Sequence, residues 1–168
     1  MDTVYFIYFL IHIPITFLMD ATFVIPTKYQ INIQKTLSEF HIEQNKDFLA
    51  IETPLWIQIF VLFELIFQVP IFFYAVYHYL TNNKSFKFKS WIYLTIYGFN
   101  AGFTTLVCFI YVIMESNDHG LNNKELINLL SLYTPTMLLP FYMMIDFSMR
   151  INNQLNIINN INIKEKTK

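Results

Sequence analysis

Two carboxylic acids lie in or beside segments that are otherwise almost entirely apolar. Asp20 ends the apolar run 4–19, and Glu64 lies within a second apolar run, 55–69. An ionised carboxylate at the centre of a membrane helix costs about 2.5–3.5 kcal/mol on translocon-insertion scales. Such residues are retained where they face a partner, a cavity or a ligand. The sequence therefore predicts that both acids belong to a functional site.

Further polar side chains recur at helical spacing around these acids. His12, Thr16 and Asp20 are four residues apart and share one helix face, and Glu64 and Gln68 have the same spacing. Because unpaired polar groups are costly in lipid, we expect these side chains to face inward around one polar spot in an aromatic cavity. Two other apolar runs contribute the remaining polar residues: Asn100, Thr104, Thr105, Tyr133, Thr134 and Thr136.

Acids in such a cavity favour a ligand that supplies positive charge or hydrogen-bond donors. Lipophilic amines and hydroxylated sterols both meet this description. Asp20 is expected to share a proton with a neighbouring acid, and Glu64 to be a hydrogen-bonding wall residue tied to Gln68 or to the fourth span. A proton or ion pathway is a competing interpretation, but the sequence shows no inverted repeat.

Each of these residues also has a structural interpretation. Thr104 and Thr105 can bond carbonyls of their own helix, and His12 can bond a neighbouring helix. Asp20 can be hydrated at the membrane interface, and Glu64 can have a structural role alone.

The composition places the chain in a membrane. It has 168 residues, 55% hydrophobic and only 14% charged, with a mean hydropathy of +0.40. A soluble domain carries about 25% charged residues. The net charge of −1 offers no basic face for a phosphate backbone, which excludes nucleic-acid binding. The one cysteine, Cys108, excludes an intramolecular disulfide and is expected to be a buried apolar side chain.

Four apolar stretches are long enough to cross a bilayer core, which needs about 20 residues per helix. They span 4–25, 55–80, 90–114 and 126–149 and predict an all-α, multi-pass membrane protein with a four-helix bundle. The first stretch lacks a basic leader region and is expected to remain in the mature protein. The lumenal segment 27–53 has apolar residues spaced for a short amphipathic interfacial helix: Ile31, Ile33, Leu37 and Phe40.

The basic residues are unequally distributed between the two ends of this bundle. Seven of the eleven fall in the 81–89 loop or at and beyond Arg150. The positive-inside rule therefore predicts that both termini are cytosolic. Asp146 lies four residues before Arg150, a spacing that favours an ion pair near the cytosolic end.

The chain is expected to divide into a membrane domain, 1–150, and a cytosolic Asn- and Lys-rich tail, 151–168. Residues 152–162 lack a clear period and are expected to be disordered or loosely interfacial. The last five residues, 164–168, place lysines three and five from the end. They resemble a dilysine signal that retains membrane proteins in the endoplasmic reticulum.

Three motifs occur in a distinctive order. Residues 8–16 read YFLIHIPIT and are followed by Met19, Asp20 and Pro26. Residues 63–70 read FELIFQVP, and residues 131–135 read SLYTP, followed by LPF at 139–141 and Arg150. Together they closely resemble the first, second and fourth spans of the sigma-2 receptor (transmembrane protein 97) family, within the EXPERA group of four-helix membrane proteins. The similarity covers nearly the whole chain.

The resemblance implies an endoplasmic-reticulum protein that binds sterols and lipophilic amines in an occluded pocket. Asp20 matches the acid that partners a ligand amine, and Asp47 matches a second acid that supports it and would share its proton. Thr136 and Asn100 depart from the family pattern, which bears on ligand selectivity, and the 27–46 segment matches poorly. The candidate ligand-binding residues are Asp20, Asp47, Glu64, Gln68, Thr104, Leu132, Tyr133, Thr136 and His12.

The implied role is non-catalytic binding of sterols or oxysterols that regulates cholesterol homeostasis and trafficking, with neither a cofactor nor a metal. The bilayer, the Niemann–Pick type C cholesterol transporter and a second copy of the chain are the expected partners. Nuclear-envelope, lysosomal and plasma membranes are further expected locations. The alternative is a sterol Δ8–Δ7 isomerase, because the EXPERA group includes the emopamil-binding isomerases. The resemblance implies that those enzymes carry a His/Glu pair, four residues apart, in their second span. This chain has Glu64 and Gln68 at the corresponding positions, and Gln cannot relay a proton.

Overall fold

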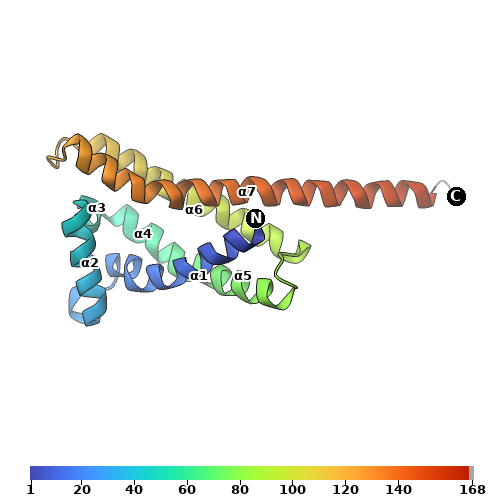
Figure 1. Cartoon of the computed structure of the whole chain (residues 1–168), viewed down its shortest axis with the longest axis horizontal. Coiled ribbons are helices and arrows are strands. Elements are labelled where there is room, and N and C mark those ends of the chain that lie inside the picture. The colour runs from blue at the N-terminus through green and yellow to red at the C-terminus, as the bar shows by residue number, and fades with distance from the viewer. Residues whose placement is uncertain (167–168) are drawn as a thin grey trace.

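The computed structural model describes residues 1–166, in which all regular secondary structure is helical (Figure 1). The expected retrieval signal continues to Lys168 and so lies partly outside the described residues. Four helical stretches in the described range are long and apolar enough to cross a membrane, which confirms the predicted all-α class with four spans. They are Asp2–Phe23, Leu55–Thr81, Phe88–Glu115 and Asn123–Glu165.

Two of the spans change helix type along their length. The first consists of α1 (Asp2–Leu18) and a 3₁₀ turn, Asp20–Phe23. The second consists of α4 (Leu55–Phe63), a π-helical turn and α5 (Val69–Thr81). The segment between them contains a 3₁₀ turn, Thr27–Tyr29, and the helices α2 (Asn32–Asn45) and α3 (Phe48–Glu52), while the last two spans are α6 (Phe88–Glu115) and α7 (Asn123–Lys166).

The last helix extends well beyond the predicted fourth span. Residues 151–166 continue α7 away from the bundle as a single helix (Figure 1). The expectation of disorder in 152–162 is therefore wrong. The segment contains neither Gly nor Pro, and a helix that is already nucleated by a packed span propagates at little cost.

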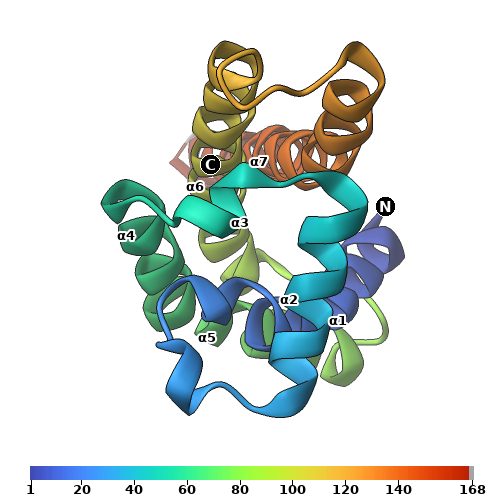
Figure 2. The ribbon, with the colours of Figure 1, turned by 90° about the vertical axis from the view of Figure 1, so that its left-hand side faces the viewer.

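The close packing of α6 on α7 depends on a glycine. A Cβ added at Gly98 would lie 2.5 Å from the carbonyl oxygen of Pro140 and 2.8 Å from the backbone nitrogen of Met144. Small residues allow membrane helices to approach in this way. The α6–α7 pair forms one side of the bundle, opposite α1, α4 and α5 (Figures 1 and 2).

A cluster of charges joins the N-terminus of α1 to α7 at one end of the bundle. Arg150 donates hydrogen bonds of 2.7 Å to both Asp2 and Asp146, and the Tyr5 hydroxyl donates one of 2.8 Å to Asp146. The backbone N–H of Phe86, in the loop before α6, also donates to Asp2. The predicted Asp146–Arg150 pair is confirmed.

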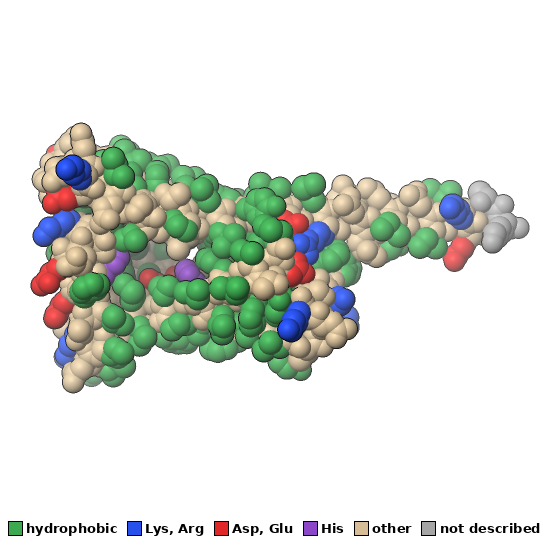
Figure 3. Space-filling model, in the orientation of Figure 1, with side chains coloured by type: hydrophobic (Ala, Val, Ile, Leu, Met, Phe, Trp, Pro, Cys, Tyr) green, Lys and Arg blue, Asp and Glu red, His purple; other side chains and the backbone are tan. Residues whose placement is uncertain are grey.

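The opposite end is covered by α2 and α3 (Figure 2). The predicted amphipathic helix is present, but Ile31, Ile33 and Phe40 are exposed while Gln34 is buried. Apolar side chains also cover much of the outer surface of the spans (Figure 3). This distribution suits a protein whose surroundings are lipid.

The interior contains two packed clusters. One is aromatic and lies toward the N-terminal end of α1, with Tyr5, Phe9, Phe72, Tyr97 and Phe147 among its buried members. The other joins α3 to the spans beside it and includes Leu49, Val112 and Leu129.

Candidate functional site

A cavity of about 380 Å³ lies between α1, α2, α4, α6 and α7. Cavities that hold small molecules typically have volumes of about 300–1,000 Å³. Figure 3 shows the hollow from one side, with histidine and acidic side chains inside it. It opens to the outside on that face, so it is less closed than the occluded pocket that the resemblance implied.

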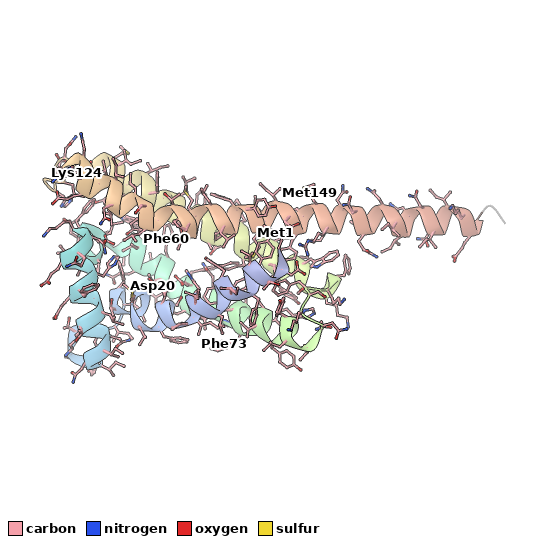
Figure 4. All side chains as sticks on the ribbon, in the orientation of Figure 1. Met1, Asp20, Phe60, Phe73, Lys124 and Met149 are labelled. Carbon is pink, nitrogen blue, oxygen red and sulfur yellow. The ribbon has the colours of Figure 1, made fainter. Side chains whose placement is uncertain are left out.

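Most of the cavity wall is apolar. Asp20, beyond the end of α1, and Phe60, on α4, both line it (Figure 4). Cys108 lines it as well and is buried, as the sequence predicted. The remaining apolar wall residues include Ile15, Met19, Phe23, Ile57, Val61 and Leu132.

One polar group in the cavity wall, named here its polar end, consists of His12, Asp20 and Glu64. One nitrogen or oxygen atom from each lies within 4.8 Å of the other two. Nε2 of His12 is 3.6 Å from Oε1 of Glu64, and the buried Thr16 hydroxyl donates a 2.6 Å hydrogen bond to that oxygen. The helical face predicted from the spacing of His12, Thr16 and Asp20 thus meets Glu64 from the second span.

The π-helical turn Glu64–Gln68 places Glu64 at this point. The N–H of Val69 bonds the carbonyl of Glu64, five residues earlier. Pro70 follows, and a proline ring collides with the carbonyl four residues before it in a regular α-helix. The wider turn relieves that collision, and such turns are frequent at functional sites.

Aromatic rings fix the orientation of the His12 imidazole. The ring stacks on Tyr8 at 4.9 Å between centroids and lies nearly perpendicular to the Phe72 ring, at 5.3 Å between centroids. Tyr8 is held in turn by a 2.7 Å hydrogen bond to Tyr97 on α6. The polar end of the cavity is therefore built on packed helices.

Asp47 holds the segment between the first two spans against α7. The residue is 2% exposed, and Oδ1 accepts hydrogen bonds from the N–H groups of Leu49 and Ala50 at the start of α3. Oδ2 accepts a 3.0 Å hydrogen bond from the Tyr133 hydroxyl and lies 2.9 Å from Nε2 of His41.

The two expected pairings of the acids are not those found. The acid whose carboxylate approaches Asp20 is Glu64, whereas Asp47 pairs with His41 and Tyr133. Glu64 bonds Thr16 on the first span rather than Gln68 or the fourth span. Helical spacing specifies faces within one helix but not which faces of different helices meet.

Eight of the nine candidate residues line the cavity, and Gln68 does not. Its amide is buried and donates a 2.6 Å hydrogen bond to Oδ1 of Asn100 on α6. The hydroxyls of Thr104 and Thr136 donate to carbonyls of their own helices. These hydrogen bonds are therefore structural, although both residues line the cavity.

Sequence reasoning missed the contribution of α2. Ser38, His41 and Asn45 line the cavity from that helix. They are spaced at i, i+3 and i+7, so they share one helical face. The spacing is present in the sequence, but the apolar residues of the same segment predict an interfacial helix and do not indicate which face covers a cavity.

These features define a multi-pass membrane protein with a ligand-sized cavity between its spans. The chain matches the family model EXPERA (EXPanded EBP superfamily) over residues 33–147, which is more than half of its length, and it belongs to that superfamily.

Relatives of this chain align along most of its length. It is 37% identical over 147 residues to Efficient mitochondria targeting-associated protein 19 of Saccharomyces cerevisiae, covering 81% of this chain and 90% of that protein. It is 30% identical over 145 residues to Sigma intracellular receptor 2 of Homo sapiens, covering 83% and 82%. The Sigma intracellular receptor 2 of Xenopus tropicalis is 27% identical over 152 residues, covering 86% of each chain. The resemblance inferred from the three motifs is confirmed.

Proposed function

We propose that this chain is an endoplasmic-reticulum membrane protein that binds sterols or oxysterols and lipophilic amines in the cavity and takes part in sterol homeostasis. The observation that carries the proposal is the cluster of Asp20, Glu64 and His12 in the wall of a ligand-sized cavity that also has a large apolar surface. The relatives named Sigma intracellular receptor 2 support a receptor role.

The chemistry of the cavity suits an amphipathic ligand with one polar end. An ammonium group beside two carboxylates gains more from the interaction in this low-dielectric site than it would in water. A sterol hydroxyl can instead donate to a carboxylate or accept from His12. The apolar body then contacts Phe23, Ile57 and Val61, and each Å² removed from water contributes about 25 cal/mol.

Location and partners follow from the sequence and the relatives. The basic residues near the N-terminal end of α1, together with the lysines of the C-terminal segment, support cytosolic termini and retention in the endoplasmic reticulum. We extend the proposal to the Niemann–Pick type C cholesterol transporter and a second copy of this chain as partners. Co-purification of the transporter from membranes, and cross-linking of two differently tagged copies, test these contacts.

The proposal is tested with a photoreactive sterol added to the purified protein. The probe is expected to label peptides that line the cavity, and a lipophilic amine should suppress the labelling. Asp20→Asn and Glu64→Gln should reduce either the labelling by the sterol or the suppression of that labelling by the amine. Asp118→Asn changes an exposed loop residue and should have neither effect. Labelling confined to peptides outside the cavity, unaffected by the amine, would contradict the proposal.

One observation favours the isomerase alternative. His12 and Glu64 come from different spans yet lie 3.6 Å apart. An imidazole beside a carboxylate can relay a proton, which Gln68 cannot do. Isomerisation adds a proton to one carbon and removes one from another, and the intervening cation is stabilised by aromatic faces. The purified protein should be incubated with a Δ8-sterol. A Δ7 product that disappears in His12→Phe would establish this activity instead.

The yeast relative suggests a second cellular role. Its name describes association with efficient mitochondria targeting, and the alignment covers 81% of this chain. Expression of this chain in yeast that lack that relative tests whether the role is shared. Restored targeting by wild type but not by Asp20→Asn would connect this role to the cavity.

A further inference from the structure

The polar end of the cavity has the donor atoms of a metal site. His12, Asp20 and Glu64 supply one nitrogen and two carboxylates, and the three donor atoms lie within 4.8 Å of one another. Zinc takes these ligand types at about 2.0–2.2 Å, which places neighbouring ligand atoms about 3.3–3.6 Å apart in a tetrahedron. The separation between His12 and Glu64 is already 3.6 Å.

The charge of the cluster also favours a divalent cation. Two carboxylates and a neutral imidazole carry a charge of about −2 when both acids are ionised. A divalent cation neutralises that charge, because metal binding displaces protons from its ligands. Among the described residues, neither Arg nor Lys lines this cavity.

The surroundings provide the outer contacts that metal sites require. Thr16 donates a hydrogen bond to the Glu64 carboxylate, and ligating carboxylates are commonly held in this way. Tyr8 and Phe72 fix the plane of the His12 ring. Three protein ligands leave a fourth position for a molecule in the cavity, as in zinc sites that bind substrates.

We propose that His12, Asp20 and Glu64 bind a divalent transition-metal ion, with zinc as the best match, and leave one coordination position open to the cavity. A sterol hydroxyl could occupy that position, whereas a lipophilic amine would compete with the ion for the same carboxylates. The site goes beyond the proposed ligand-binding function, because the ion can bind whether or not sterols do.

Cobalt is the probe of choice, since Co²⁺ takes zinc sites and absorbs visible light when bound. Purified, tag-free protein in detergent should bind one Co²⁺ per chain, and Zn²⁺ should displace it. Thr16→Val should weaken Co²⁺ binding by about 10–100-fold, as the loss of an outer hydrogen bond does. His12→Phe, Asp20→Asn and Glu64→Gln should weaken it further.

A surface pair supplies the matched control. His119 lies 3.6 Å from Glu52, the same separation as His12 and Glu64, but outside the cavity. His119→Gln should leave Co²⁺ binding unchanged. Gel filtration and thermal unfolding identify variants that do not fold. If a variant does not fold, the test is whether a lipophilic amine displaces Co²⁺ from the wild-type protein.

The outcomes separate this inference from the proposed function. Absence of Co²⁺ absorption at millimolar concentrations, or absorption that persists in Asp20→Asn and Glu64→Gln, would overturn the metal site, and Asp20-dependent amine binding would still stand. Co²⁺ binding at these residues in a protein that binds neither sterol nor amine would establish the metal site and reject the proposed function.

Discussion

Thr16 on α1 donates a 2.6 Å hydrogen bond to Oε1 of Glu64 in the π-helical turn of the second span. The same oxygen lies 3.6 Å from Nε2 of His12. Thr16 is fully buried, so this contact joins the first two spans at the polar end of the cavity. It explains how Asp20 and Glu64, each costly in a membrane segment, come to share one site.

Replacing Thr16 tests this connection. Thr16→Val keeps the side-chain shape but leaves the Glu64 carboxylate without its donor, which should destabilise the fold by about 1–2 kcal/mol. Thermal unfolding in detergent measures the change. Thr16→Ser retains the hydroxyl and should lie much closer to the wild type, whereas equal losses in both variants would show that packing, and not the hydrogen bond, is at work.

Asp47 should be more important for stability than for ligand contact. Asp47→Ala removes the acceptor for two backbone N–H groups and for Tyr133, and loss of such a cap alone costs about 0.5–2 kcal/mol. Tyr133→Phe breaks only one of these contacts and should cost less. Proteolysis of the loop between α2 and α3 provides the readout. A cleavage rate unchanged in Asp47→Ala would contradict this role.

Gln68 offers a contrast with the residues that line the cavity. Its amide bonds Asn100 within the helix packing, so Gln68→Leu should lower stability while leaving amine affinity unchanged. Interhelical hydrogen bonds in membranes contribute about 0.6 kcal/mol on average and up to about 1.7 kcal/mol. A double-mutant cycle with Asn100→Leu measures the coupling, and a large loss of affinity in Gln68→Leu would place the amide in the binding site after all.

The spans and the inward polar face of α1 were predictable because both depend on local patterns. Hydropathy identified the four apolar stretches, and the spacing of His12, Thr16 and Asp20 identified one helix face. The partner of Asp20 was not predictable in this way. Its proximity to Glu64 depends on the packing of two separate spans and on the π-helical turn before Pro70.

The cavity wall formed by α2 shows a second limit of sequence reasoning. His41 and its neighbours share a face, but nothing local specifies that this face covers the cavity while Ile33 and Phe40 point outward. The expectation of disorder in residues 152–162 was wrong for a separate reason. The composition of this segment lacks a hydrophobic period, yet the helix continues because α7 is nucleated within the bundle.

The α6–α7 contact predicts an ordering of two glycine variants. The three atoms nearest to a Cβ at Gly98 are backbone atoms of Pro140 and Met144, whereas the three nearest to a Cβ at Gly102 belong to the Phe141 ring. A ring can move more readily than backbone, so Gly98→Ala should destabilise the fold more than Gly102→Ala does. The expected loss for Gly98→Ala is about 1–3 kcal/mol relative to the wild type. Thermal unfolding of both variants checks the order, and the reverse order would contradict the packing described for this pair.

The central claim is that Asp20 supplies the countercharge for a cationic ligand, and its most direct test is equilibrium binding of a radiolabelled lipophilic amine. Asp20→Asn keeps the shape of the side chain and removes its charge. Because losing one partner of a buried charge pair costs about 2–5 kcal/mol, the affinity should fall at least about 30-fold. Asp118→Asn, an exposed control, should bind like the wild type. An Asp20→Asn protein that is folded and binds the amine with wild-type affinity would contradict the account.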